Sequence, residues 1–136
     1  MSDGVPAGFE PFEAHTPFID LVGPVHVRED DDGARVFGLR IDGRHLNHRG
    51  TAQGGLLATL VDFAVGRAIE AGLDGEAEQA TVSLTTDFLG PVAEGAWLEA
   101  HAKVERLGSR LAFADCSLVA DGREVVRGRA VFAVVS

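Results

Sequence analysis

Residues 45–72 read HLNHRGTAQGGLLATLVDFAVGRAIEAG, and the remainder of the chain is built around this stretch. From Gly54 onward it predicts a helix of about five turns in which almost every position is apolar or small. A helix that is apolar on all sides belongs in a core rather than on a surface. Asp62 interrupts the apolar pattern in the middle of this helix, where a buried carboxylate is costly unless it is paired, hydrogen-bonded or functional.

Asp62 has mostly small neighbours on its own face of the predicted helix. Helical periodicity places these residues there: Gly55, Ala58, Thr59, Val65, Gly66 and Ile69. The small residues one turn to either side leave space over the carboxylate. One interpretation is structural, with Asp62 capping a neighbouring loop or pairing with an arginine. The other interpretation is a reactive group in a hollow.

The start of the helix favours the reactive interpretation. Gly54 and Gly55 allow a ligand to approach the first turn without obstruction by a Cβ atom. The first amide groups of a helix are unpaired and lie at the positive end of its dipole. We therefore expect an oxyanion site a turn or two from the carboxylate. Such a pair suits acyl chemistry, in which an acid activates water and amides stabilise the charge on the carbonyl oxygen.

The order of Asn47, then Gln53-Gly54-Gly55, then Asp62 resembles the signature of hotdog-fold acyl-CoA thioesterases of the phenylacetate-pathway (PaaI-like) type. The context HLNHRGTAQGGLLATLVDFAVG is similar to that family nearly throughout, and weaker similarity extends from about residue 17 to the C-terminus. The family usually has His where this chain has Gln53. The resemblance implies an α+β hotdog fold, in which a curved antiparallel sheet of five to six strands wraps one long central helix.

The resemblance also implies roles for three of these residues. In the family, the Asp that matches Asp62 is the general base for water or attacks the thioester directly, and the sequence does not choose between these routes. The Asn that matches Asn47 orients the attacking water or the thioester carbonyl, although Asn is also common as a simple turn residue. The glycine that matches Gly54 supplies the oxyanion-hole amide, a role compatible with a glycine needed only for close packing.

Four further residues are weaker candidates. Gln53 can hold the loop by side-chain hydrogen bonds as a His would, but it cannot titrate, so a weakened site is the alternative. Thr81 falls where the family tends to have Ser or Thr near the site, and it is also a good strand residue. Arg106 and Arg110 flank a Gly-Ser turn and are candidates for binding the phosphates of coenzyme A.

Length and composition bound the remaining possibilities. The 136 residues predict a single domain, with residues 1–16 as a loose N-terminal arm. A net charge of −9 argues against general affinity for nucleic acid or anionic membrane. The absence of a long apolar run and the single cysteine, Cys116, favour a cytoplasmic protein. The five histidines lack metal-ligand spacing, so we expect neither a metal nor a redox cofactor.

Alternating patterns and turn signals predict the strands. Two strands, residues 25–28 and 34–41, flank an acidic turn at Asp32-Gly33, and a short helical turn at residues 17–23 precedes them. Four more strands follow the long helix, at residues 81–88, 96–107, 111–120 and 124–135. In the first of these, Val82, Leu84 and Phe88 are expected to face one way and Thr81 the other. This strand also lacks the usual protections of a sheet edge, so we expect it to pair with a second copy.

These observations predict a thioesterase that hydrolyses an acyl-CoA or aroyl-CoA to the free acid and coenzyme A. They predict a homodimer with shared sites, or a homotetramer built as a dimer of dimers. In the family, the Asp comes from one chain and the Asn and the oxyanion glycine from its partner. A non-catalytic acyl-CoA binding module, suggested by Gln53, and an enoyl-CoA hydratase of the same fold remain alternatives. The identity of the acyl group stays open.

Overall fold

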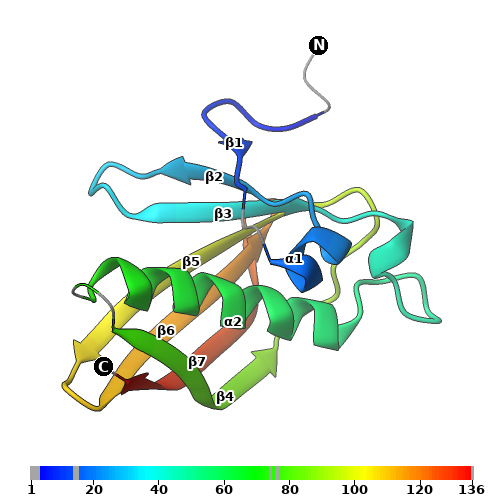
Figure 1. The fold of residues 1–136 in the computed structure, drawn as a ribbon. Helices are drawn as coiled ribbons and strands as arrows, with labels where there is room; N and C mark the ends of the chain where they lie inside the picture. The colour runs from blue at the N-terminus through cyan, green and yellow to red at the C-terminus, as the bar shows by residue number, and fades with distance from the viewer. Residues whose placement is uncertain (1–3, 14–15, 74, 76, 136) are drawn as a thin grey trace.

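The computed structural model describes residues 4–13, 16–73, 75 and 77–135, and it shows one long helix lying across a curved antiparallel sheet (Figure 1). The sheet has the order β1-β2-β3-β5-β6-β7-β4. Its strands are β1 (Glu10–Pro11), β2 (His26–Glu29), β3 (Arg35–Arg40), β4 (Glu78–Phe88), β5 (Trp97–Leu107), β6 (Leu111–Ala120) and β7 (Arg123–Val135). The helical elements are α1 (Pro17–Val22), the 3₁₀ turn Gly43–His45 and α2 (Gly54–Ala71). The hotdog fold expected from the sequence is confirmed.

The predicted central helix is α2, which begins at Gly54 as expected and ends at Ala71. Its apolar residues form the middle of the core: Val61, Val65 and Ile69 are fully buried. They pack against inward-facing residues of the sheet, among which Leu98 and Ala114 are also fully buried. Burying an aliphatic side chain of this size contributes about 1.5–3 kcal/mol, so the α2–sheet interface is a main source of stability.

The predicted strands and turns agree with the structure to within a few residues. Asp121 and Gly122 both have positive φ angles, 51° and 84°, as a two-residue turn between β6 and β7 requires. The acidic segment between β2 and β3 is a surface turn in which the Asp30 side chain accepts hydrogen bonds from the amides of Asp32 and Ala34, both at 2.9 Å. The strand predicted at residues 96–107 is β5, in which Leu98 and Ala100 are fully buried.

Two expectations are wrong. The described part of the N-terminal arm is packed against the fold rather than loose, and the described residues form seven strands rather than five to six. The two-residue β1 pairs with β2 and makes a seventh strand. Phe12 packs edge-to-face against Phe37 and Phe63, with ring centroids 5.1 and 5.8 Å apart, so the arm adds an aromatic contact to one end of the core. Residues 1–3 and 14–15 of the expected arm lie outside the described residues.

The sequence predicted that Thr81 and Leu84 of β4 point to opposite sides of the sheet. This prediction is wrong, and the cause is a β-bulge. The pairing register between β4 and β7 shifts between Thr81 and Ser83, which leaves Val82 as the extra residue. Because of this shift, Thr81 and Leu84 lie on the same side, toward α2, whereas Val82 is 61% exposed. The bulge therefore allows a polar residue and an apolar residue of β4 to face the helix together.

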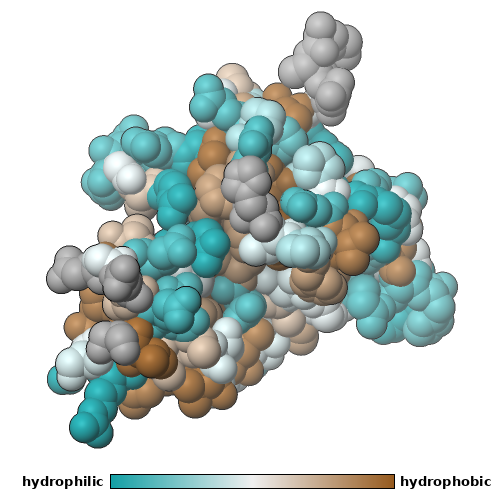
Figure 2. Space-filling model, viewed as in Figure 1, coloured by the Kyte–Doolittle hydropathy of each residue, from teal (hydrophilic) through white to brown (hydrophobic). Residues whose placement is uncertain are grey.

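β4 is an edge strand, because it pairs with β7 and ends the sheet order. Val82 and Phe88 on this strand and Leu89 after it are more than half exposed. Figure 2 shows apolar surface at the bottom of the view, where β4 lies in Figure 1. The described part of the chain therefore exposes apolar side chains beside an unpaired row of backbone groups.

Among the described residues, no helix has both the length and the apolar character needed to cross a membrane.

Candidate active site

Asp62 lies in a hollow of about 440 Å³ between α1, α2 and β4. Its carboxylate is half-buried rather than fully buried, contrary to the expectation for a core helix. Of the small residues predicted to share its face, Gly55, Ala58, Thr59 and Gly66 line this hollow, so the predicted space over the carboxylate exists. The other walls are largely apolar and are formed by Phe18, Ile19, Phe63, Leu84 and Phe132.

The carboxylate of Asp62 accepts a short hydrogen bond from the Thr81 hydroxyl, with 2.6 Å between Oγ1 and Oδ1. Within the described part of the chain, no lysine, arginine or histidine lies within ion-pair distance of Asp62. The structural interpretation, in which Asp62 pairs with an arginine, therefore finds no support. The hydroxyl fixes one oxygen of the carboxylate and leaves lone pairs on both oxygens available to a water molecule or substrate.

The start of α2 presents two free amides, as predicted. Gln53 is the N-cap residue, and its carbonyl accepts the amides of Leu56 and Leu57 at 3.0 and 3.2 Å. The amides of Gly54 and Gly55 have no backbone partner among the described residues. A Cβ atom built on Gly55 would meet nothing within 4 Å, whereas one built on Gly54 would lie 3.5 Å from the ring of Phe88, so the approach is open at Gly55 and bordered by Phe88 at Gly54. The site has the donors that an oxyanion needs.

The Gly54 amide and Asp62 do not meet within one chain, although Gly55 lines the Asp62 hollow. Gly54 is eight residues before Asp62, which corresponds to about 12 Å along a helix axis. Gly54 also lines a different hollow, of about 660 Å³, with Arg49, Phe88 and Leu89, and this hollow shares no lining residue with the Asp62 hollow. Oxyanion donors must lie about 2.7–3.1 Å from the oxygen that they stabilise. One thioester therefore cannot contact the Gly54 amide and the Asp62 carboxylate of the same subunit.

Asn47 is engaged by its own loop. Its Oδ1 accepts the amides of Arg49 and Thr51 at 2.9 and 3.2 Å, and its Nδ2 donates to the Thr51 hydroxyl at 3.1 Å. This is the turn role that the sequence left open as an alternative. One hydrogen of Nδ2 remains free for another acceptor. The structure does not bring Asn47 into the Asp62 hollow of the same chain.

The side chain of Gln53 is exposed and makes no capping hydrogen bond. The loop is instead held at this point by the Gln53 backbone, whose amide donates to the His45 carbonyl at 2.8 Å. The hypothesis that the Gln53 side chain positions the loop is therefore not supported within one chain.

His45 has a structural role in the loop that precedes α2. It is 3% exposed, and its Nδ1 accepts the Asp42 amide at 3.0 Å while Nε2 donates to the Val22 carbonyl at 2.6 Å. Arg44 reinforces the link by donating to the carbonyls of Leu21 and Gly23. These hydrogen bonds hold the loop that leads to α2 against the end of α1. Residues of α1 form one wall of the Asp62 hollow.

The pKa of Asp42 is lowered, mainly because its carboxylate accepts hydrogen bonds from the Arg44 side chain. Asp42 therefore stays ionised and supports the turn before the Asn47 loop.

Arg106 and Arg110 are exposed at the turn between β5 and β6, and neither lines the Asp62 hollow or the Gly54 hollow. Arg49, in contrast, lies beside Gly54 in the larger hollow. The sequence had singled out neither Arg49 nor Arg67. Arg67 lines the Asp62 hollow, and the signal that could have found it is simple, since it is the only cation in an otherwise apolar helix.

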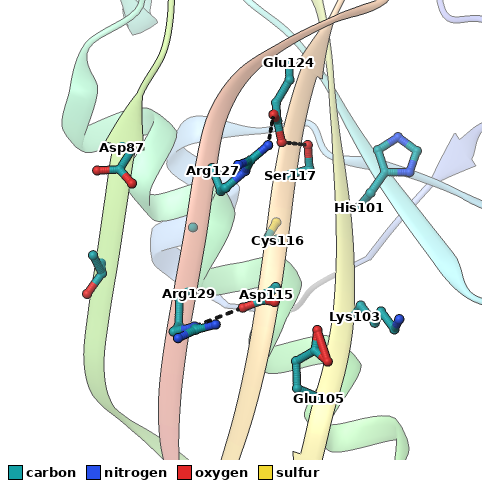
Figure 3. Close-up of a pocket in the computed structure, with 12 residues that line it drawn as sticks. Asp87, His101, Lys103, Glu105, Asp115, Cys116, Ser117, Glu124, Arg127 and Arg129 are labelled. Carbon is teal, nitrogen blue, oxygen red and sulfur yellow. Dashed lines mark hydrogen bonds and ion pairs between the residues drawn. The ribbon is translucent and has the colours of Figure 1, made fainter.

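A third hollow, of about 490 Å³, lies on the face of the sheet opposite α2 (Figure 3). Two of its four carboxylates are paired with cations: Arg129 binds Asp115 at 3.2 Å, and Arg127 binds Glu124 at 2.7 Å. None of the predicted site residues lies there. Cys116 borders this hollow but is buried in the core, and burial raises the pKa of its thiol to about 12. The described residues contain no group of three or more His, Cys, Asp or Glu placed to hold a metal ion.

With this geometry in place, the similarity to known proteins is informative. Residues 49–127 match the family model of the thioesterase superfamily. The chain belongs to the thioesterase superfamily. A protein of Pseudomonas aeruginosa, provisionally named an esterase, is 43% identical over 128 residues, which cover 94% of this chain and 96% of that protein.

Two solved structures extend the likeness of this thioesterase-superfamily chain. One is a Ralstonia eutropha protein related to phenylacetic acid degradation and provisionally named a thioesterase. It has a TM-score of 0.78 at 26% identity, over 87% of this chain and 90% of its own. The other is a point variant of the phenylacetic acid degradation protein PaaI from Thermus thermophilus, with a TM-score of 0.77 at 27% identity, over 87% and 98% of the two chains. The resemblance to PaaI-like proteins is confirmed, and the family supports a hydrolase.

Proposed function

We propose that this protein hydrolyses an acyl-CoA or aroyl-CoA thioester to the free acid and coenzyme A, with Asp62 as the reacting carboxylate. The observation that carries the proposal is the environment of Asp62: a carboxylate without a cationic partner, held by Thr81, in a hollow with apolar walls. Such a group is available either to remove a proton from water or to attack the thioester carbon. Membership of the thioesterase superfamily supports this reaction type.

We infer that the reaction requires a dimer in which each site combines two chains. The Gly54 amide and the Asp62 carboxylate of one subunit are about 12 Å apart along α2 and line different hollows, so one subunit does not supply both to the same thioester carbonyl. A second copy that pairs along the exposed edge of β4 brings its own Gly54 and Asn47 loop toward Asp62 of the first. Such a two-fold pairing would also cover Val82 and Phe88 and satisfy the free backbone groups of β4.

In this arrangement the chemical roles are divided between subunits. The Gly54 amide stabilises the negative charge on the thioester oxygen, and the remaining Nδ2 hydrogen of Asn47 orients the water or the carbonyl. In one route Asp62 of the other subunit accepts the proton of the attacking water, and the C–S bond breaks to release coenzyme A. In the other route the Asp62 carboxylate attacks the acyl carbon and displaces the coenzyme A thiolate, and water then opens the resulting mixed anhydride to the free acid. Arg49 lies beside Gly54 and is better placed than Arg106 and Arg110 to meet the phosphates of coenzyme A.

A panel of acyl-CoA and aroyl-CoA thioesters tests the proposal against its two alternatives. Release of coenzyme A is followed with a thiol-detecting dye, to which the buried Cys116 with its raised pKa should contribute little. Hydrolysis supports the proposal. Binding without turnover would establish the non-catalytic module, and addition of water to an enoyl-CoA without release of thiol would establish the hydratase.

A further inference from the structure

The Asp62 hollow contains a second ionic group. Arg67 lines the same hollow and lies five residues after Asp62, about 7.5 Å further along the axis of α2. Its guanidinium lies over the ring of Phe63, 5.7 Å from the centroid, so the side chain rests on an apolar wall. The backbone carbonyl of Arg67 accepts the Arg35 side chain at 3.2 Å, and this contact would survive replacement of the Arg67 side chain.

The hydrogen-bonding capacity of Arg67 is largely unused. Its Nε atom is buried and has no hydrogen-bond partner among the described residues. Glu70 Oε1 lies 3.5 Å from this atom, within ion-pair range, but the Glu70 side chain is 55% exposed. Because Glu70 is exposed to solvent, this contact contributes little, and the two terminal nitrogens of the guanidinium carry four further N–H donors. Arg67 therefore offers donors to a ligand in the hollow.

β4 places a second polar group beside Gly66, one helical turn beyond Asp62. Gln79 Nε2 donates to the Gly66 carbonyl at 3.1 Å, which fixes the side-chain amide, and its Oε1 has no protein partner in the described part of the chain. Gln79 is two residues before Thr81 and therefore lies on the same side of the strand. The wall beside Gly66 and Gln79 is apolar, because the ring of Phe132 lies against Gly66 there.

We propose that Arg67 is a specificity-determining residue that selects acyl groups whose far end carries an oxygen hydrogen-bond acceptor. The assignment rests on the proposed hydrolysis at Asp62. With the thioester carbon beside Asp62, the acyl chain lies along the apolar walls and its terminal oxygen reaches the guanidinium. A plain hydrocarbon end would desolvate the guanidinium without giving it a partner, which is unfavourable. The oxygen belongs to a carboxylate or to a hydroxyl, and Gln79 Oε1 can accept a hydrogen bond only from the hydroxyl.

Three six-carbon thioesters test this inference: hexanoyl-CoA, 6-hydroxyhexanoyl-CoA and the mono-CoA thioester of adipic acid. The wild type should prefer at least one oxygen-tipped thioester to hexanoyl-CoA by about tenfold or more in kcat/KM, the effect of one hydrogen bond to a charged group. In Arg67→Met this preference should fall to near one through KM, with the hexanoyl-CoA rate retained. The substrate preferred by the wild type distinguishes the carboxylate from the hydroxyl.

Arg129→Met is the matched control, because Arg129 lies on the opposite face of the sheet, and it should keep the wild-type preference. If Arg67→Met lowers the melting temperature, Arg67→Gln is the second variant and should also lose the preference. A wild type without preference, or an Arg67 variant that keeps it, would overturn the inference.

Calorimetric binding of the three thioesters to Asp62→Asn separates this inference from the proposed function. The same preference in binding, lost on adding Arg67→Met, supports the role of Arg67 even if the wild type hydrolyses none of them. Hydrolysis of hexanoyl-CoA without any preference would instead overturn the role of Arg67 and leave the proposed function standing.

Discussion

Carboxylates on the two faces of the sheet lie in opposite environments. Asp115 and Glu124 on the outer face are exposed or half-exposed, and each is bound by an arginine. Asp62 on the helix side has apolar walls around it and a hydroxyl as its hydrogen-bond donor. Paired carboxylates on a wet surface contribute little and do no chemistry. A half-buried carboxylate with no cation within ion-pair distance has a cost that a reaction would explain.

The largest expected effect on kcat comes from replacing the Asp62 carboxylate by an amide, and the same replacement on the outer face is its control. Asp62→Asn should lower kcat by much more than tenfold, because Asn is not a base, while the Thr81 hydrogen bond and the fold are kept. Asp115→Asn, on the outer face, should change kcat by less than twofold. Both variants are assayed with a thioester that the wild type hydrolyses. An Asp62→Asn enzyme that retains more than about a tenth of the activity, a loss below about 1.4 kcal/mol, would refute Asp62 as the reacting group.

A smaller effect is expected from the hydroxyl that holds Asp62. Thr81→Val keeps the shape of the side chain but removes the donor, so kcat should fall by about tenfold, the value of one hydrogen bond to a charged group. Thr85→Val is the control, because Thr85 is on the same strand but lines the outer hollow. Steady-state kinetics of both variants check this. Equal losses in the two would show that β4 simply tolerates valine poorly.

The smallest effect is expected at Gln53. Its side chain is exposed and makes no capping hydrogen bond, so Gln53→His should change kcat/KM by less than about tenfold. Gln53→Ala, measured beside it, shows whether any side chain is needed at this position. A gain of a hundredfold or more with His would mean that the chain carries a weakened site, and it would favour the binding-module alternative.

The sequence was sufficient for much of the fold and for part of the site. The apolar run interrupted by Asp62 predicted α2 and the hollow, because periodicity and residue size are local properties. Asp32-Gly33 predicted the turn between β2 and β3 for the same reason. The bulge at Val82 was missed because it arises from the register between two strands, which alternation within one strand does not reveal.

Long-range contacts account for the other differences between the sequence-based predictions and the structure. The burial of His45 depends on the Val22 carbonyl, which lies 23 residues earlier in the chain. The packing of the N-terminal arm depends on Phe37 and Phe63, whose positions only the folded sheet and helix define. The distance between Gly54 and Asp62 could have been read from the helix itself. It points away from a site within one chain and toward one shared between two.

Subunit mixing tests that shared site most directly. Asp62→Asn and Asn47→Ala are each expected to be inactive alone, and they are unfolded and refolded together in equal amounts, with each refolded alone as the control. Half of the dimers are then hybrids, and each hybrid has one intact site of two, so activity should recover to about a quarter of the wild type. No recovery, although mass spectrometry shows the hybrids, would contradict a site in which Asp62 of one subunit works with the Asn47 loop of the other.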